Sequence, residues 1–497
     1  MYSWILENPD YRKWRDDQQS RLLWIRGDPG KGKTMLLCGI VDNLKKSNVK
    51  SQLLSFFFCQ ATDSRINNAT AVLRGLIHQL VNQQPSLISH IHKKYIDRGK
   101  ELFEDINSWV AVSQILTDIL EDCDLRNIIL VIDGLDECQV NLCELLDRIM
   151  QKWSSYSHVK WIVSSRNWPS IHERLDAAGQ LSLELNAKSV STAVGLYIQH
   201  KMRQLVKLKK YDPETQDAIQ QQLVQNAEGT FLWVALVCQY LERLPPRDPL
   251  TKLHKFPRGL GPLYKRMMRE IFESDTLELE DVDLCKRILA VMTVVYRPVT
   301  LRELVSLAET SEALSDHAEL SETDIGFCGS FLTVKDNTVY FVHQSAKDFL
   351  VEKASSEIFP SGMEEVHHTI SSKSLQAMTR ILKRDIYSLH APGFPVDQVK
   401  QPEQDPLAPV RYSCIHWVNH LHDYHSQQTT KYHEDLQDGG MVDKFLQKKY
   451  LHWLEALALL GRYPEGVVAM SRLADLVQVS HAENSLLCSP KICSNVA

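Results

Sequence analysis

Residues 27–34 of this chain form a glycine-rich loop of the kind that binds the phosphates of a nucleotide. The segment reads GDPGKGKT and matches the pattern G-x-x-x-x-G-K-[ST]. It follows the apolar run LLWI at residues 22–25 and precedes a stretch with a helical pattern, which is the context this loop requires. The loop therefore predicts both an α/β fold and a bound phosphate group.

The residue types in this phosphate-binding loop suit a phosphate. Gly27, Gly30 and Gly32 let the backbone turn tightly enough for its N–H groups to point at phosphate oxygens. A helix that begins near Gly32 places the positive end of its dipole beneath the same phosphates. We expect Lys33 to reach the β- and γ-phosphates and Thr34 to bind Mg²⁺ through its hydroxyl.

Strand-like and helix-like segments alternate over residues 21–185, which predicts a P-loop NTPase domain of the α/β class: a parallel sheet with helices on both faces. The expected strands are Leu22–Arg26, Leu53–Cys59, Ile128–Asp133, Val159–Ser165 and Leu181–Leu185. Residues 33–46 read as an amphipathic helix between the first two strands. Its expected buried residues are Met35, Leu36, Ile40 and Leu44.

Three acidic residues lie at the end of the third expected strand or just after it. Asp133 comes directly after the apolar run, where an NTPase needs a carboxylate that faces Mg²⁺, and we assign it that role. Asp136 and Glu137 come next, and we expect them to orient or deprotonate an attacking water. The alternative is that these acids only cap the following helix.

The fourth expected strand delivers an arginine at its carboxyl end, in Ser164-Ser165-Arg166. Ligands of doubly wound sheets bind beyond the carboxyl ends of the strands. We therefore expect Arg166 to sense a γ-phosphate, the alternative being a solvated arginine.

The phosphate-binding loop, the segment DGLDE (133–137) and the segment SSR (164–166) occur in the order found in the NACHT NTPase domain of the STAND class of signalling ATPases, which they resemble. The segments WILEN (4–8), FFCQATD (57–63) and EGTFLW (228–233) are similar to fungal NLR-like proteins of the vegetative-incompatibility type. This resemblance runs from roughly residue 4 to residue 475.

Together with the residue patterns, the resemblance implies five parts: a lead-in helix, a NACHT nucleotide-binding domain, a first helical domain, a winged-helix domain and a second helical domain. Their expected bounds are 1–20, 21–185, 186–260, 261–355 and 356–497.

Residues 261–355 carry signals of their own. Thr300 and Glu303 have the spacing of a capping box. Two alternating segments, 331–334 and 338–342, flank Lys335-Asp336-Asn337 and predict a hairpin. Ser345 and Asp348 have a box-like spacing that predicts the start of the next helix.

His343 lies at the end of the second hairpin segment. On its own, a single histidine indicates a structural role. In NLR-like proteins, however, the histidine at this strand end contacts the β-phosphate of bound ADP and holds the closed state. The resemblance implies the same role for His343.

The resemblance also implies a nucleotide-operated switch. ADP holds it closed, and exchange for ATP with Mg²⁺ favours an open form. That form self-associates through its nucleotide domains, with copies of itself or with related NLR-like proteins, and slow hydrolysis resets it. Two alternatives remain open: an AAA-like or kinase-like P-loop enzyme with steady turnover, and a scaffold whose nucleotide is structural. The residues do not distinguish ATP from GTP.

Composition narrows the partners and the compartment. A net charge of −6 argues against a nucleic-acid surface. Eleven cysteines without a C-x-x-C pair fit a reducing compartment, and the longest apolar run, 231–237, is too short to span a bilayer. We therefore expect a cytoplasmic protein. Because 26 residues precede Gly27 and no repeat period appears near the C-terminus, we expect neither an effector domain nor a repeat array.

Overall fold

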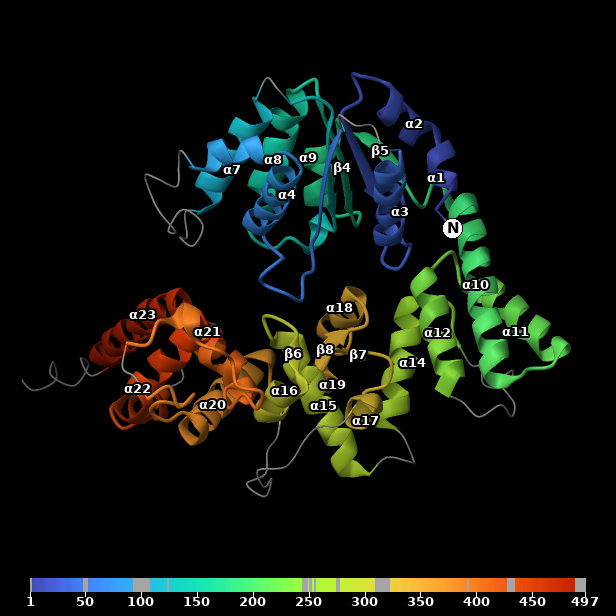
Figure 1. Ribbon diagram of the computed structural model, residues 1–497. Coiled ribbons are helices and arrows are strands. Elements are labelled where there is room, and N and C mark those ends of the chain that lie inside the picture. The colour runs from blue at the N-terminus through green and yellow to red at the C-terminus, as the bar shows by residue number, and fades with distance from the viewer. Residues whose placement is uncertain are drawn as a thin grey trace, which may run out of the picture. The chain divides into compact units, whose positions relative to one another are not determined.

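The computed structural model describes residues 2–47, 52–92, 108–122, 125–243, 249, 253, 256–273, 278–308, 322–390, 393–426 and 434–487. The chain forms two compact units, Met1–Met268 and Arg269–Ala497. Figure 1 shows both, coloured from blue to red along the chain. The finer five-part division stays a prediction.

The first unit contains a five-stranded sheet in which every pair of neighbouring strands is parallel. The strands are β1 (Leu22–Arg26), β2 (Leu53–Phe58), β3 (Ile128–Asp133), β4 (Val159–Ser165) and β5 (Gly179–Ser182). Their order across the sheet is β2-β3-β4-β1-β5. Strand β4 therefore lies between β1, which leads into the phosphate-binding loop, and β3, which ends in Asp133.

The fifth strand ends earlier than the sequence predicts, at Ser182 rather than at Leu185. The Leu185 N–H donates to Ser182 Oγ at 3.2 Å, and the Asn186 side chain donates to the Ser182 carbonyl at 2.7 Å. These bonds turn the chain out of the sheet, and Leu185 is left exposed.

Helices cover both faces of this sheet. On one face, α4 (Ala69–Gln83), α7 (Ser108–Leu120), α8 (Leu142–Gln151) and α9 (Pro169–Leu175) share a core with alternate strand residues such as Trp24, Leu130 and Trp161. On the other, α3 (Lys33–Lys46) contacts β2, β3 and β4, while α2 (Pro9–Asp16) contacts β1 and β5. The predicted α/β fold class is confirmed.

Helix α3 has the predicted bounds, but its buried face differs from the expected one. The buried stripe runs through Leu36, Leu37, Ile40 and Val41. Met35 was expected inside and is 64% exposed. At 3.6 residues per turn it lies about 200° around the helix from Leu37, so it points away from the sheet.

The remaining described helices of the first unit are α1 (Trp4–Glu7), α10 (Ala187–Lys209), α11 (Pro213–Asn226) and α12 (Phe231–Arg243). Helix α10 packs on α11 and α12. Helix α14 (Leu260–Phe272) contains the division between the two units. Short 3₁₀ turns follow α4, β3 and α8: η1 (Pro85–Leu87), η2 (Leu135–Glu137) and η3 (Trp153–Ser155).

The second unit begins with helices around a small antiparallel sheet in the order β6-β8-β7. The elements are α15 (Leu279–Val294), β6 (Val299–Thr300), α16 (Leu301–Ala308), α17 (Glu322–Phe327), β7 (Leu332–Lys335), β8 (Thr338–Phe341), α18 (Gln344–Glu352) and α19 (Ser355–Ile358). The predicted hairpin is confirmed. Asp336 and Asn337 both have positive φ, as a two-residue type I′ turn requires. A winged-helix assignment for residues 261–355 stays a prediction.

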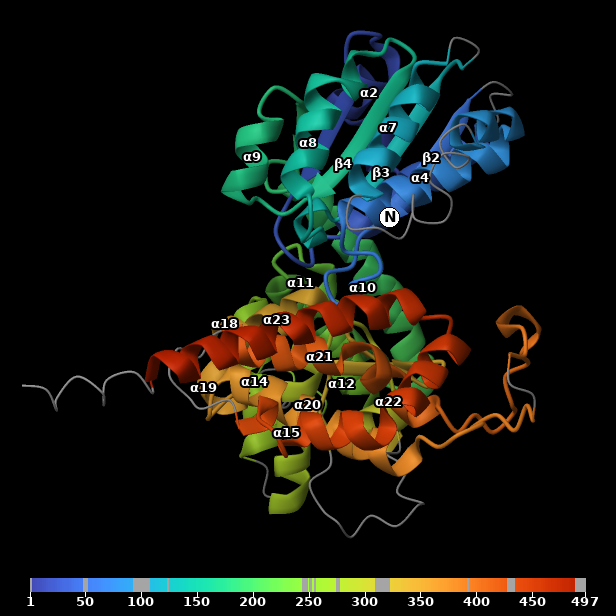
Figure 2. The ribbon, with the colours of Figure 1, turned by 90° about the vertical axis from the view of Figure 1, so that its left-hand side faces the viewer.

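Four further helices share one core in the second unit: α20 (Met363–Ile381), α21 (Arg411–Ser426), α22 (Met441–Leu459) and α23 (Tyr463–Leu487). Figure 2 shows them stacked, with α21 beside α20 and α23. The rings of Trp417 and Trp453 meet edge to face in this core. The short turns η4 (Val396–Gln398), η5 (Ala408–Val410) and η6 (Glu434–Leu436) connect the helices. In the residues the structure describes, every helix is too short or too polar for a membrane span.

The capping box at α16 is confirmed and is reinforced by an ion pair. The Thr300 N–H donates to Glu303 Oε2 at 2.8 Å, and the Glu303 N–H donates to Thr300 Oγ1 at 3.3 Å. Arg297 pairs with Glu303 Oε1 at 2.7 Å, and the Glu303 side chain is 2% exposed. One buried carboxylate therefore satisfies both a helix end and a guanidinium.

We expect Glu303→Ala to lower the free energy of unfolding of the second unit by about 3 kcal/mol, because it leaves Arg297 without its buried counter-ion. Urea denaturation followed by circular dichroism measures the change. Glu352→Ala, an exposed glutamate of α18, is the control and should change stability by less than about 0.5 kcal/mol. Equal effects from the two variants would contradict this account.

Candidate functional site

The phosphate-binding loop lies between β1 and α3, and its glycines are required by geometry. Gly32, at the N-terminus of α3, has φ +86°, and Gly30 has φ +75°. A Cβ at Gly32 would lie 2.9 Å from the Phe231 ring. Any other residue at position 32 would therefore be strained in its backbone and would collide with α12.

Three contacts hold this loop from outside. The Gly30 carbonyl accepts from the Phe231 N–H at 2.9 Å, at the start of α12. Lys31 Nζ donates to the Glu228 carbonyl at 2.6 Å. On the other side, the Asp28 N–H donates to Glu184 Oε1 at 2.7 Å. The loop is thus held by the segment after β5 and by residues at and just before the start of α12. The sequence did not predict Lys31 and Glu184 as its supports.

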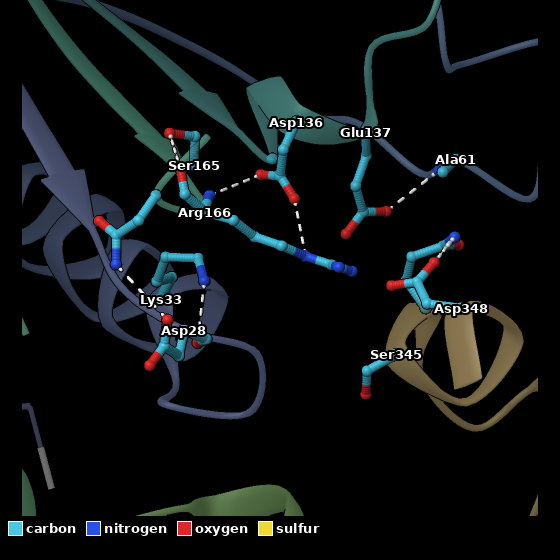
Figure 3. Close-up of polar contacts among 12 residues, drawn as sticks. Asp28, Lys33, Ala61, Asp136, Glu137, Ser165, Arg166, Ser345 and Asp348 are labelled. Carbon is cyan, nitrogen blue, oxygen red and sulfur yellow. Dashed lines mark hydrogen bonds and ion pairs between the residues drawn. The ribbon is translucent and has the colours of Figure 1, made fainter. Parts of the chain in front are cut away.

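Lys33 extends along the loop, and its ammonium donates to the loop's own carbonyl groups (Figure 3). Nζ lies 2.5 Å from the Gly27 carbonyl and 3.1 Å from that of Asp28. Burial lowers the pKa of Lys33, and the nearby Asp136 carboxylate partly opposes this. The site therefore holds a poorly hydrated cation where phosphate oxygens would bind.

Asp133 is 4% exposed and accepts a hydrogen bond from a buried serine. Ser164 Oγ donates to Oδ1 at 2.5 Å. Burial raises the pKa of Asp133, and the hydroxyl groups of Ser164 and Thr34 oppose that rise. A hydroxyl beside a carboxylate is an all-oxygen donor set of the type that Mg²⁺ prefers, so Thr34 and Asp133 fit that ion.

Asp136 is engaged with Arg166 through both of its oxygens. Arg166 Nε lies 3.0 Å from Asp136 Oδ2, and the Arg166 N–H donates to Oδ1 at 3.0 Å (Figure 3). The Asp136 side chain is 3% exposed and that of Arg166 is 15% exposed. Asp136 thus positions the arginine at the end of β4.

Glu137 is an acid of the site whose pKa is raised to near neutral pH. Burial raises its pKa to about 7, although the Ala61 N–H donates to Oε2 at 3.0 Å and stabilises the ionised form. The neighbouring carboxylates of Asp136 and Asp133 also raise this pKa. A carboxylate that titrates near neutral pH is suited to general-base chemistry.

His343 belongs to the second unit, where it is the N-cap of α18. The prediction that Ser345 opens this helix was wrong, because the Ser345 N–H instead donates to His343 Nδ1 at 3.1 Å. The Ser345 hydroxyl lies 2.8 Å from the same nitrogen. With Nδ1 as acceptor, the ring proton of a neutral His343 is on Nε2.

In the first unit the structure gathers the predicted site residues at the carboxyl edge of the sheet. These are Gly27, Gly30, Gly32, Lys33, Thr34, Asp133, Asp136, Glu137 and Arg166. Ser164 was not predicted as a site residue, because in the segment SSR only the arginine carries a charge that indicates a ligand.

Comparison with known proteins agrees with the resemblance seen in the sequence. Residues 1–166 match the Nephrocystin 3, N-terminal family. The chain is 52% identical over 493 residues to the vegetative incompatibility protein HET-E-1 of Podospora anserina, an alignment that covers 96% of this chain. The chain spans only 36% of the length of that relative. The predicted similarity to fungal vegetative-incompatibility proteins is confirmed.

Among solved structures, the Walker-type ATPase paby2304 of Pyrococcus abyssi is 14% identical, with a TM-score of 0.32 over 70% of this chain and 94% of its own. The ORC1 protein of Aeropyrum pernix in complex with DNA is 15% identical, with a TM-score of 0.30 over 72% of this chain and 94% of its own. TM-scores this low say nothing about the function of this chain.

The raised pKa of Glu137 predicts a pH dependence of stability. Its ordinary pKa is 4.5 and its folded value is about 7, so the folded state binds this proton more tightly. The resulting stabilisation, about 3 kcal/mol, is fully present below pH 4.5 and is lost as the pH rises through 7. Urea unfolding of the nucleotide-free protein between pH 5 and 8 should show this loss.

Glu137→Gln should remove this part of the pH dependence, whereas Glu144→Gln, at an exposed position of α8, should keep it. An unchanged pH profile in Glu137→Gln would show that another group is responsible.

Proposed function

We propose that this chain, a relative of a fungal vegetative incompatibility protein over almost its whole length, is a nucleotide-dependent signalling switch. It binds ADP or ATP with Mg²⁺, cycles between a closed and a self-associating state, and acts in fungal incompatibility or innate immunity. The observation that carries the proposal is the strand order, which places β4 between β1, leading into the phosphate-binding loop, and β3, ending in the buried Asp133.

In this proposal the loop and Lys33 hold the phosphates. The backbone N–H groups that follow Gly30 and the N-terminus of α3 supply fixed positive dipoles. The Lys33 ammonium exchanges its loop carbonyl partners for phosphate oxygens, which are stronger, charged acceptors. A Mg²⁺ ion bound by Thr34 and Asp133 would neutralise phosphate charge.

In the proposed hydrolysis the three acids have different roles. Asp133 serves the metal, and Asp136 holds Arg166, which contacts the γ-phosphate. Glu137 is then the acid that accepts a proton from the attacking water, a role supported by its pKa of about 7. The proposal favours Glu137 over Asp136 for this role, because both oxygens of Asp136 contact Arg166.

The loop contacts explain how a nucleotide could be sensed beyond the sheet. The Gly30 carbonyl accepts from the Phe231 N–H at the start of α12, and the Lys31 ammonium donates to the Glu228 carbonyl just before it. Phosphates bound by the loop would change these contacts. A ligand shifts such an equilibrium by its difference in affinity for the two states. The direct connection from the loop to α12 provides one route for that difference.

His343 supplies the state-specific contact in the proposal. Capping of α18 through Nδ1 leaves the ring proton on Nε2, the form in which an imidazole donates to a phosphate. We propose that this donor contacts the β-phosphate of ADP in the closed state.

Two other functions are distinguished by turnover. An AAA-like or kinase-like enzyme would hydrolyse or transfer phosphate steadily, at several turnovers per second. A scaffold with structural nucleotide would retain bound ATP without hydrolysis. The switch requires turnover that is measurable but far slower than that of such an enzyme, and radiolabelled ATP separates the three.

We expect the purified protein to contain ADP, which denaturation and anion-exchange chromatography would release and identify, including its base. Lys33→Ala should contain no nucleotide, because it removes the ammonium that offsets the phosphate charge. Lys188→Ala, an exposed lysine of α10, is the control and should retain it. Nucleotide-free wild-type protein that also fails to bind added ADP or ATP would refute the proposal.

We expect His343→Ala to release ADP about 10- to 100-fold faster, because a hydrogen bond to a charged group contributes roughly 1.5–3 kcal/mol. With ATP and Mg²⁺ this variant should self-associate more readily, as measured by light scattering. His343→Asn separates the two roles of the residue, since asparagine also caps helices well but is too short to replace the imidazole.

The His343→Asn protein should therefore keep the stability of α18 and still release ADP rapidly. A His343→Ala protein that stays monomeric with ATP would contradict the switch.

A further inference from the structure

We propose that Ser164 is a positioning residue that holds Asp133 in the orientation required to bind Mg²⁺, and that it thereby sets the affinity of the site for the metal. This inference rests on the proposed function, because it concerns the metal that accompanies the nucleotide. Ser164 itself touches neither the nucleotide nor the ion.

The sheet order places Ser164 beside Asp133. Strand β4 pairs with β3 on one side and with β1 on the other, and Ser164 is opposite Ile25 of β1. Its side chain is completely buried. A buried hydroxyl requires hydrogen-bond partners, and those of Ser164 both belong to the end of β3.

The directions of these two bonds are determined by their donors. The Gly134 N–H can act only as a donor, and it donates to Ser164 Oγ at 3.0 Å. The serine proton is therefore directed to Asp133 Oδ1, at 2.5 Å. One carboxylate oxygen is thus occupied by a neutral donor, and the carboxylate is held against rotation.

Ser164 thus hydrogen-bonds to Asp133, the expected Mg²⁺ ligand, without being a ligand itself. Groups that hydrogen-bond to a ligating carboxylate fix its orientation, and their loss typically weakens metal binding 10- to 100-fold. Without Ser164 the carboxylate could rotate, and one of its buried oxygens would lose its donor.

Ser165 provides a matched control in the next position of the same strand. It is also completely buried, but its hydroxyl faces other partners. Ser165 Oγ accepts from Trp24 Nε1 at 2.8 Å and donates to the Arg166 carbonyl at 2.8 Å. Substituting it removes a buried hydroxyl without removing a donor to Asp133.

The experiment measures the Mg²⁺ concentration at which a fluorescent ATP analogue reaches half of its metal-dependent gain in affinity. We expect Ser164→Ala to raise this concentration about 10- to 100-fold. Affinity for the analogue in EDTA should stay at the wild-type value. Mn²⁺ binding in the presence of nucleotide, measured by electron paramagnetic resonance, should weaken in parallel, while Ser165→Ala keeps the wild-type Mg²⁺ midpoint.

Two further variants protect the test against misfolding. Ser164→Cys has nearly the same size but a weak donor, so it should shift the midpoint in the same direction as Ser164→Ala. Ser164→Thr keeps the hydroxyl and should return the midpoint toward wild type.

Several outcomes would overturn the inference. A wild-type Mg²⁺ midpoint in both Ser164→Ala and Ser164→Cys would do so. Equal losses of affinity with and without Mg²⁺ would indicate a general structural role instead. If the wild-type protein bound no nucleotide under any condition, the proposed function would fail first. Nucleotide binding that depends on Mg²⁺ but not on Ser164 would refute only the inference about Ser164.

Discussion

The candidate site depends on the position of β4 between β1 and β3. Because β4 lies there, its carboxyl end brings Ser164 to Asp133 at the end of β3 and Arg166 to Asp136 just beyond it. Ser164 orients Asp133, and Asp136 in turn fixes Arg166. If β3 lay directly beside β1, neither contact could form. Strand order, more than any single motif, makes the loop, the acids and the arginine into one site.

Burial determines how the charges of this site behave. It raises the pKa values of Asp133 and Glu137 and lowers that of Lys33, since a charge is less stable away from water. Hydroxyl donors keep Asp133 suited to a cation, whereas Glu137 receives one backbone N–H and titrates near neutrality. Adjacent carboxylates thus acquire different chemistry from their partners rather than from their type.

Much of this arrangement is predictable from the residues. The phosphate-binding loop, four of the five strands, helix α3, the α16 capping box and the β7–β8 hairpin are encoded by local patterns, and each was anticipated closely. The errors have local causes as well. Met35 was assigned to the wrong side of α3, β5 ends early at the Ser182 turn, and His343 rather than Ser345 caps α18.

The sequence alone indicated that a glycine-rich loop of the phosphate-binding type lies between a strand and a helix, and that acids and an arginine lie at the ends of two later strands. Those features follow from short-range periodicity and from backbone requirements such as positive φ at Gly32. Only the tertiary structure decided that Ser164 faces Asp133, that Asp136 holds Arg166, and that Lys31 reaches Glu228. These pairs lie 30 or more residues apart, and strand order and burial bring them together.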